Sequence, residues 1–140
     1  MNIHVLGIML NCRCAVLLCT FPSGYSLIMV VVYFPCFNTS AEYECELSEC
    51  LGFIEACLSM DKYNDIIVLG DMNFDCSPAN AGFRIFSDFC SVTGLKHADS
   101  VCLSMIDYMF FQETTTNKSV IHHIFVTDKT LKMCQELCYH

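Results

Sequence analysis

The sequence predicts a layered domain of the α/β or α+β class, because its expected elements run strands, helix, strand, helix, strands, helix. The apolar run Leu27–Phe34 contains three consecutive valines, which favours a buried strand. An apolar stripe at spacings of three and four then predicts a helix, and a short Ile-Ile-Val-Leu run follows it. The chain has 140 residues, of which 54% are hydrophobic and 16% charged, so it is long and apolar enough to form one hydrophobic core. We expect a single domain over residues 1–140.

The first part of the chain is expected to form three strands. Ile3–Leu10 and Ala15–Phe21 are the first two, and Pro22–Gly24 forms a turn. Tyr25–Phe34 is a long buried strand that Pro35 ends, because proline cannot donate to a sheet ladder. The short turn predicts a hairpin between the second and third strands.

A helix is predicted next, running to about Met60. Thr39 or Ser40 can cap its start, and Glu42 and Glu44 suit the positive end of the helix dipole in its first turn. Its apolar stripe consists of Tyr43, Leu47, Cys50, Leu51, Ile54 and Leu58.

Five further elements complete the prediction. Asp65–Leu69 is a short strand, and Ala81–Thr93 is an amphipathic helix with its phenylalanines turned inward. Ser104–Phe111 and Ser119–Thr127 are expected strands on either side of a polar turn, and Asp128–Leu137 is a last short helix.

The charge and hydropathy of the chain exclude some classes of protein. The net charge is −8, which argues against strong binding to nucleic acid, since such binding depends on cations that neutralise phosphates. The longest apolar run has eight residues, whereas a membrane-spanning helix needs about 20. Asn11 and Arg13 interrupt the apolar N-terminus, and no lysine or arginine precedes it, so we expect no signal peptide, no membrane association and an intracellular location in cytoplasm or nucleus.

The twelve cysteines are scattered and include no Cys-x-x-Cys pair. Without a secretory signal, this distribution favours reduced thiols, several of them on apolar faces. Cys134, Cys138 and His140 could bind zinc together with Cys12 and Cys14. No spacing matches a zinc module, so we expect no metal site there.

The segment most indicative of chemistry is Gly70-Asp71-Met72-Asn73, which follows the short buried strand. If the segment is extended, Asp71 and Asn73 point to the same side. A carboxylate that accepts a proton from water and an amide that donates to a phosphate oxygen would then converge, which suits metal-assisted phosphodiester hydrolysis. Gly-Asp-x-Asn is also a common turn sequence.

The order of four segments resembles the endonuclease/exonuclease/phosphatase (DNase I-like) family, specifically the endonuclease domain of non-LTR (LINE-type) retrotransposons. Val32–Pro35 resembles its Val-Tyr-x-Pro segment, and Gly70–Asn73 its Gly-Asp-x-Asn motif at about the same distance. Tyr108–Phe111 resembles a Tyr-Thr-Phe-Phe stretch, and Ser119–His123 resembles a Ser-x-Ile-Asp-His motif.

The resemblance implies a partial two-layer β-sandwich flanked by helices and an activity that nicks DNA with Mg²⁺ during retrotransposition. It assigns Asp71 to positioning or activating the attacking water. It assigns Asn73 to the scissile phosphate and Tyr33 to a hydrogen bond with a phosphate oxygen.

Several departures from the family pattern predict that this chain is inactive. His122 stands where the family has an aspartate that orients its catalytic histidine, and Met109 replaces a threonine that contacts substrate. The first-strand asparagine, the glutamate that ligates Mg²⁺ and the carboxyl-terminal Ser-Asp-His segment have no counterpart, so we expect a domain truncated at both ends that does not hold Mg²⁺ tightly. Asp107 resembles the Ser-x-Ile-Asp-Tyr form of the motif but lies only 36 positions after Asp71.

Two alternatives remain open. The chain could be a surviving metal-dependent phosphodiesterase that recruits Asp107 or His123, or that is completed by a partner. It could instead be a non-catalytic interaction module whose exposed sheet edges bind another chain or a second copy. His122 and His123 are not expected to share one ion, because adjacent residues of a strand point to opposite faces.

Overall fold

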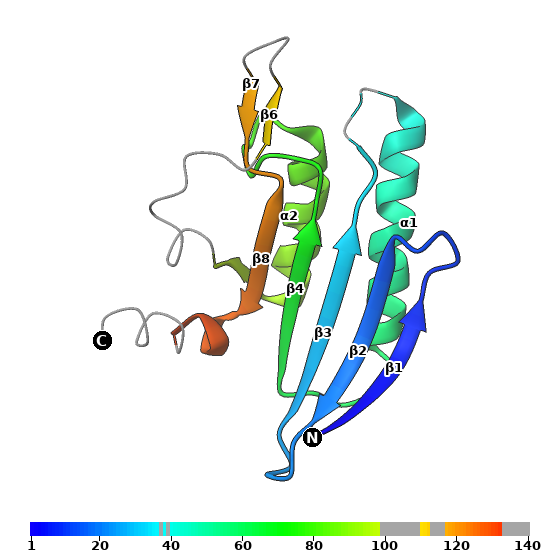
Figure 1. Cartoon of the computed structure of the whole chain (residues 1–140), viewed down its shortest axis with the longest axis vertical. Helices are drawn as coiled ribbons and strands as arrows, with labels where there is room; N and C mark the ends of the chain where they lie inside the picture. Colours follow the sequence, from blue (N-terminus) through cyan, green and yellow to red (C-terminus); the bar gives the residue numbers. More distant parts are fainter. Residues whose placement is uncertain (37, 39, 99–109, 113–116, 133–140) are drawn as a thin grey trace.

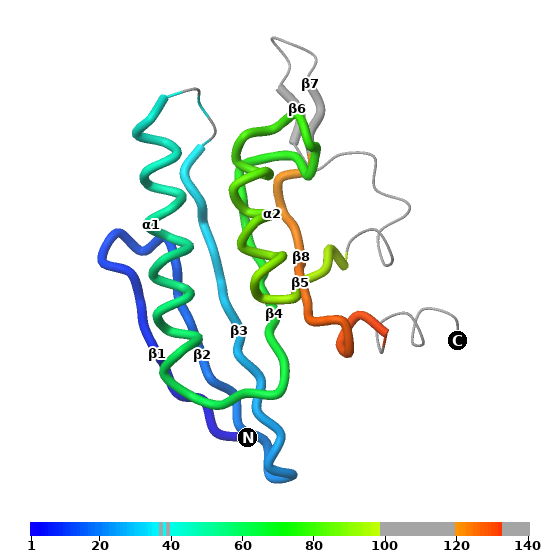
Figure 2. The backbone as a smooth tube through the Cα atoms, turned by 180° about the vertical axis from the view of Figure 1, so that it is seen from behind, coloured from blue at the N-terminus to red at the C-terminus, as the bar shows by residue number. Residues whose placement is uncertain are grey.

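A computed structural model describes residues 1–36, 38, 40–98, 110–112 and 117–132 of the chain. Its centre is a six-stranded mixed sheet in the order β1-β2-β3-β4-β8-β5, and both long helices lie on one face of it (Figures 1 and 2). The strands of this sheet are β1 (Asn2–Ile8), β2 (Cys14–Thr20), β3 (Ser26–Tyr33), β4 (Asp65–Asp71), β5 (Leu95–His97) and β8 (His122–Thr127). The helices are α1 (Ala41–Leu58) and α2 (Ala81–Thr93), and β6 (Phe110–Gln112) pairs with β7 (Asn117–Ser119) as a separate ribbon.

The sheet topology brings two strand ends together. The strands β1, β2 and β3 form consecutive antiparallel pairs, while β3 and β4 run parallel with α1 as their crossover helix. The strand β8 pairs antiparallel with both β4 and β5. Because parallel strands share their direction, the carboxyl ends of β3 and β4 meet at the same edge of the sheet.

The core lies between the sheet and the two helices. Along β3, Val30 and Val32 are 0% and 3% exposed and face this core, whereas Val31 and Tyr33 on the opposite face are 41% and 53% exposed. Leu47 of α1 and other apolar side chains of both helices complete the core. The expected fold class is therefore confirmed, and the described residues form one layer of the expected sandwich.

Both helices begin at the expected places. The Ser40 side chain caps α1 by accepting a hydrogen bond from the Tyr43 backbone N–H at 3.2 Å, and Asn80 caps α2 in the same way. The helix α2 ends at Gly94, whose φ of 74° is the left-handed conformation that glycine adopts readily. None of the described helices is long and apolar enough to cross a membrane.

Two predicted elements differ from the structure. The single strand expected over Ser119–Thr127 is wrong, because β7 ends at Ser119 and β8 begins at His122. Between them the Val120 N–H donates to the Asp75 carboxylate at 2.9 Å, and the Ile121 carbonyl accepts from Met72, so this stretch leaves the strand ladder. The sequence analysis predicted no element at the position of the three-residue strand β5.

Other predictions fall partly outside the described residues. Of the strand expected over Ser104–Phe111, only the end is described, within β6, and of the last helix residues 128–132 are helical. The nine cysteines among the described residues all carry thiols that are not in disulfides, and five of them on β2 and the helices are buried: Cys14, Cys19, Cys50, Cys57 and Cys90.

Candidate functional site

The candidate site lies at the shared carboxyl end of β3 and β4. The parallel register places Tyr33 directly beside Asp71, although 37 residues separate them in the sequence. The pairing continues one residue further, where the Phe34 N–H donates to the Asp71 carbonyl at 2.9 Å. The ends of β3 and β4 therefore lie side by side at one edge of the sheet.

Gly70 allows this close approach. Its φ is +141°, a backbone conformation that residues with a side chain rarely adopt, and an added Cβ would lie 2.0 Å from the Val32 carbonyl oxygen. Both constraints favour glycine directly before Asp71. The glycine therefore fixes where the carboxylate leaves the strand.

The chain turns sharply after Asp71, so the expected extended arrangement of Asp71 and Asn73 is wrong. Asn73 has a φ of +54°, in the left-handed region, and the Asp71 carboxylate accepts the Asn73 backbone N–H at 3.0 Å. This is the turn that Asp and Asn both favour. The Asn73 side chain still lies beside the end of β3, because its amide nitrogen donates to the Phe34 carbonyl at 2.8 Å.

His122 lies opposite Asp71 across the β4–β8 pair. The two residues are partners in the register, and the His122 Nε2 is 3.9 Å from an Asp71 carboxylate oxygen. Both side chains reach solvent, with 49% of His122 and 22% of Asp71 exposed. The substitution noted in the sequence thus places an imidazole directly beside the candidate catalytic carboxylate.

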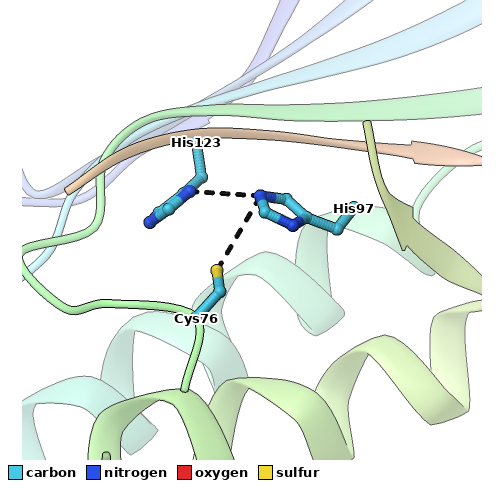
Figure 3. Close-up of side chains that lie close together, drawn as sticks. All are labelled: Cys76, His97 and His123. Carbon is cyan, nitrogen blue, oxygen red and sulfur yellow. Dashed lines mark hydrogen bonds between the residues drawn. The ribbon is translucent and has the colours of Figure 1, made fainter. Parts of the chain in front are cut away.

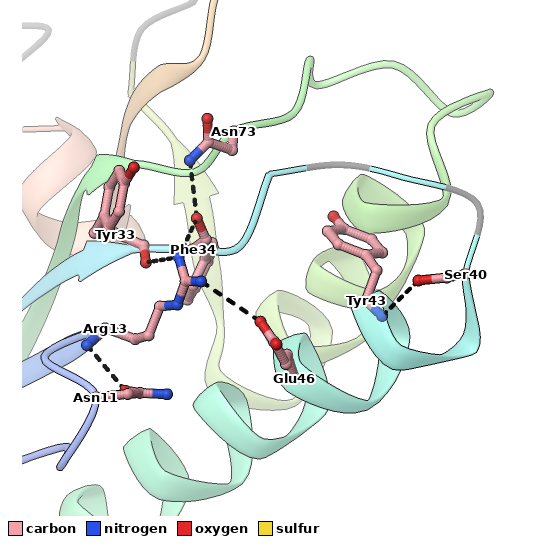
Figure 4. A network of polar contacts seen from close by, with 8 residues as sticks. All are labelled: Asn11, Arg13, Tyr33, Phe34, Ser40, Tyr43, Glu46 and Asn73. Atoms are coloured by element: carbon pink, nitrogen blue, oxygen red, sulfur yellow. Dashed lines mark hydrogen bonds and ion pairs between the residues drawn. The ribbon is translucent and has the colours of Figure 1, made fainter.

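Arg13 belongs to the same neighbourhood, and the sequence analysis did not assign it to the site. Its guanidinium lies 5.4 Å from the centre of the Tyr33 ring, donates to the Phe34 carbonyl at 3.3 Å and is 3.5 Å from the Glu46 carboxylate (Figure 4). In the same view the Tyr33 hydroxyl and the Asn73 amide oxygen both point away from Arg13. In the sequence, Arg13 is an isolated cation between two apolar strands. This pattern is the signal that could have identified Arg13 as a candidate site residue.

A groove of about 610 Å³ adjoins Tyr33 and Arg13. It is lined by Asn11, Arg13, Tyr33, Pro35, Cys36, Asn38 and Glu46. The lining contains one cation and one anion, Arg13 and Glu46, which pair with each other at 3.5 Å. The groove therefore has polar donors but no net charge from its ionised side chains.

The residues described around Asp71 do not fit a tightly held Mg²⁺. Mg²⁺ prefers oxygen ligands, and protein sites for it use one or two carboxylates with water or substrate phosphates. Among the described residues, no group of three potential ligands forms around Asp71. Its neighbour His122 offers nitrogen in place of oxygen and repels a cation when protonated.

The remaining candidates lie elsewhere. Asp107 and Met109 fall outside the described residues. His123 is 3% exposed and points to the helix-covered face, away from the exposed His122. Opposite orientation of the two histidines is what strand geometry predicts.

Comparisons with solved structures identify the fold. The chain superposes with a TM-score of 0.63 and 16% identity on a 3' phosphatase, NExo, from Neisseria bound to a product DNA hairpin, covering 94% of this chain and 60% of that one. It matches an endonuclease/exonuclease/phosphatase family protein from Leptotrichia buccalis with a TM-score of 0.59 and 14% identity, covering 91% and 48%. It matches TDP2 from D. rerio complexed with a single-strand DNA product with a TM-score of 0.57 and 16% identity, covering 91% and 52%.

The fold is therefore that of the endonuclease/exonuclease/phosphatase (DNase I-like) domains. The chain spans 60% of the Neisseria protein and about half of the other two. No protein-family model matches the sequence, and no curated protein matches it significantly.

Proposed function

We propose that this chain is a phosphodiester-binding domain of the endonuclease/exonuclease/phosphatase family that contacts DNA through Tyr33, Asp71 and Asn73 and has lost efficient hydrolysis. The observation that carries the proposal is the convergence of these three side chains at one end of β3 and β4. Two of the similar structures, the Neisseria phosphatase and TDP2 from D. rerio, contain DNA products, which supports DNA as the class of ligand.

Asn73 and Tyr33 have donors suited to a phosphodiester. The Asn73 amide nitrogen carries two hydrogens, and only one is needed for the Phe34 carbonyl, so the other can donate to a phosphate oxygen. Tyr33 is half-exposed, and its hydroxyl can donate to a second oxygen. Arg13 packs against the Tyr33 ring and is paired with Glu46. Asp71 stands where a carboxylate would accept a proton from an attacking water in an active member of the family.

The order of the motifs supports a more specific origin, the endonuclease domain of a non-LTR (LINE-type) retrotransposon that nicks DNA with Mg²⁺. Binding of DNA is weak in this proposal, because the net charge of −8 opposes a polyanion. Asp71 would be the protein ligand for Mg²⁺ in such a domain, and the metal would neutralise charge on the substrate phosphates.

Part of the proposed loss of activity follows from His122. The family places an aspartate there to orient the catalytic histidine, and an imidazole cannot supply that negative charge. A positioned acid–base group contributes about 10²–10⁴-fold to a rate, so removing its orienting carboxylate is a large loss. The His122 Nε2 lies only 3.9 Å from an Asp71 carboxylate oxygen, where it occupies space beside the candidate base.

A binding experiment tests the proposed site. Fluorescence anisotropy of a labelled single-stranded oligonucleotide at low salt is compared for the wild type, Asp71→Asn and Asp61→Asn. Both variants remove one negative charge, but Asp61 lies in the turn after α1 and only Asp71 lies at the strand ends. A charge about 8 Å from a phosphate at an effective dielectric of about 40 is worth about 1 kcal/mol, so Asp71→Asn should tighten binding roughly fivefold more than Asp61→Asn. Equal effects of the two variants would mean that DNA binds elsewhere.

A nicking experiment tests the loss of hydrolysis. Supercoiled plasmid is incubated with the wild type, His122→Asp and Asp71→Ala in Mg²⁺ and in Mn²⁺, and no measurable nicking is expected from any of them. His122→Asp restores the orienting carboxylate without the catalytic histidine that this carboxylate orients in the family. Nicking by the wild type that disappears in Asp71→Ala would overturn the proposed inactivity and show a working site. Nicking by all three would indicate a contaminating nuclease, and the preparation would be purified until the three could be distinguished.

A second candidate function is self-association or partner binding through the sheet. The described part of the sheet has β1 as an edge strand, where Ile3, Val5 and Ile8 are 55%, 59% and 58% exposed. Exposed apolar edges of this kind can pair with another strand. This interaction would not require the candidate site.

A further inference from the structure

Three potential metal ligands meet on the helix-covered face of the sheet, separate from the strand-end site. Cys76 comes from the loop after β4, His97 from the end of β5 and His123 from β8 (Figure 3). One ligand atom of each residue lies within 4.8 Å of the others. Three segments that are distant in the sequence therefore converge through side chains that bind transition metals.

We propose that Cys76, His97 and His123 bind one Zn²⁺ ion, with water in the fourth coordination position. The ligand atoms are the Cys76 Sγ, the His97 Nε2 and the His123 Nδ1. Cysteine binds zinc as a thiolate, so binding releases the Cys76 proton to solvent. A mixed thiolate and imidazole set favours zinc over Mg²⁺ or Ca²⁺, which prefer oxygen.

The spacings already approach those of a tetrahedral site. Zinc–nitrogen and zinc–sulfur bonds of about 2.0–2.1 and 2.3 Å at tetrahedral angles place two nitrogens about 3.3 Å apart and a nitrogen and a sulfur about 3.6 Å apart. The His97 Nε2 lies 3.1 Å from the His123 Nδ1 and 3.8 Å from the Cys76 Sγ. Shifts of a few tenths of an ångström would complete the geometry for these two pairs.

The other nitrogen of His123 has the contact typical of a metal-bound histidine. Its Nε2 is 3.1 Å from the Phe74 carbonyl oxygen, which can only accept a hydrogen bond. The Nε2 must therefore carry the hydrogen, and in the neutral ring the Nδ1 presents its lone pair to the centre of the cluster. Such a hydrogen bond fixes the tautomer and the ring orientation of a metal ligand.

Packing holds the two rings in place. His123 is 3% exposed, and the His97 ring stacks on Phe125 with centroids 4.7 Å apart. The His97 Nε2 faces both the Cys76 sulfur and the His123 Nδ1, so the three ligand atoms lie around one point.

The test measures metal binding by the reduced full-length chain. Zn²⁺ affinity is determined by competition with a chromophoric chelator, and Co²⁺ is used as a spectroscopic substitute whose thiolate charge-transfer band reports a bound cysteine. Loss of an outer hydrogen-bond partner alone weakens metal sites about 10–100-fold, so Cys76→Ser or His97→Asn should weaken zinc binding by more than about 100-fold. Cys76→Ser should also abolish the thiolate band.

Matched controls separate this site from the other thiols. Cys45→Ser, on an exposed position of α1, and His4→Asn, on an exposed position of β1, should leave both affinity and spectrum unchanged. Circular dichroism confirms that each variant is folded, and zinc should protect Cys76, but not Cys45, from alkylation in the wild type. If Cys76→Ser retains the affinity and the thiolate band of Cys45→Ser, or if the wild type binds no zinc, the proposal is wrong.

Discussion

Replacing Gly70 with alanine should destabilise the fold strongly, because two independent constraints meet at this residue. Its φ of +141° is unfavourable for a side chain, and strain of this kind costs on the order of 1–3 kcal/mol. An added Cβ would also lie 2.0 Å from the oxygen and 3.0 Å from the carbon and nitrogen of Val32, all backbone atoms that cannot rotate away. Overpacking adds about 1–3 kcal/mol, so the sum is about 2–6 kcal/mol, against a total stability of about 5–15 kcal/mol for a typical domain.

Two other glycines provide matched controls for the same substitution. Gly24 has a φ of +81° but nothing within 4 Å of an added Cβ, so Gly24→Ala should cost only about 1–2 kcal/mol. Gly52 lies exposed inside α1 with open space around it, so Gly52→Ala should stabilise the fold by about 0.5–1 kcal/mol. The free energies of unfolding are measured by urea denaturation followed by circular dichroism. A Gly70→Ala variant no less stable than Gly24→Ala would refute the argument that β3 and β4 require glycine for their close approach.

Three further outcomes are expected. Gly82→Ala should destabilise the contact between the helices, because an added Cβ would lie 2.0 Å from the Tyr43 hydroxyl, and Tyr43→Phe should recover part of that loss in urea unfolding of the double variant. Burial raises the pKa of Tyr43 from its ordinary 10.0 to about 12, so the unfolded chain loses the phenolic proton at a lower pH than the folded chain does. The free energy of unfolding should therefore fall as the pH rises from about 10 to 12. Tyr43→Phe should flatten this part of a plot of the urea midpoint against pH. Val5→Lys on edge strand β1 should lower the average mass measured by light scattering, whereas Val92→Lys, the same change on an exposed position of α2, should not; equal masses would exclude β1 as the contact.

Local sequence patterns predicted most of the fold. The helix at Ala81–Thr93 matches α2, and the strands before Tyr33 and Asp71 end within two residues of the predicted positions. These elements have strong periodicity and clear stop signals such as Pro35. The strand β5 has only three residues and no alternation, and it is held by its pairing with β8, which no local pattern can show.

The candidate site was predictable in outline but not in detail. Tyr33 and Asp71 each end a buried strand, and parallel pairing then brings them together. The turn at Asn73 depends on hydrogen bonds to the Asp71 carboxylate and the Phe34 carbonyl, so its left-handed backbone could not follow from strand periodicity. Arg13 reaches the site through the antiparallel pairing of β2 with β3, a long-range contact without a motif.

The alternation of side chains along β8 links the two faces of the sheet. His122 lies beside Asp71 on the exposed side, and His123, one peptide bond later, lies beside His97 on the covered side. The register of β8 against β4 therefore sets the position of both histidines at once. A slip of this register by one residue would turn His122 toward the core and His123 toward solvent, so it would disrupt the arrangements on both faces together.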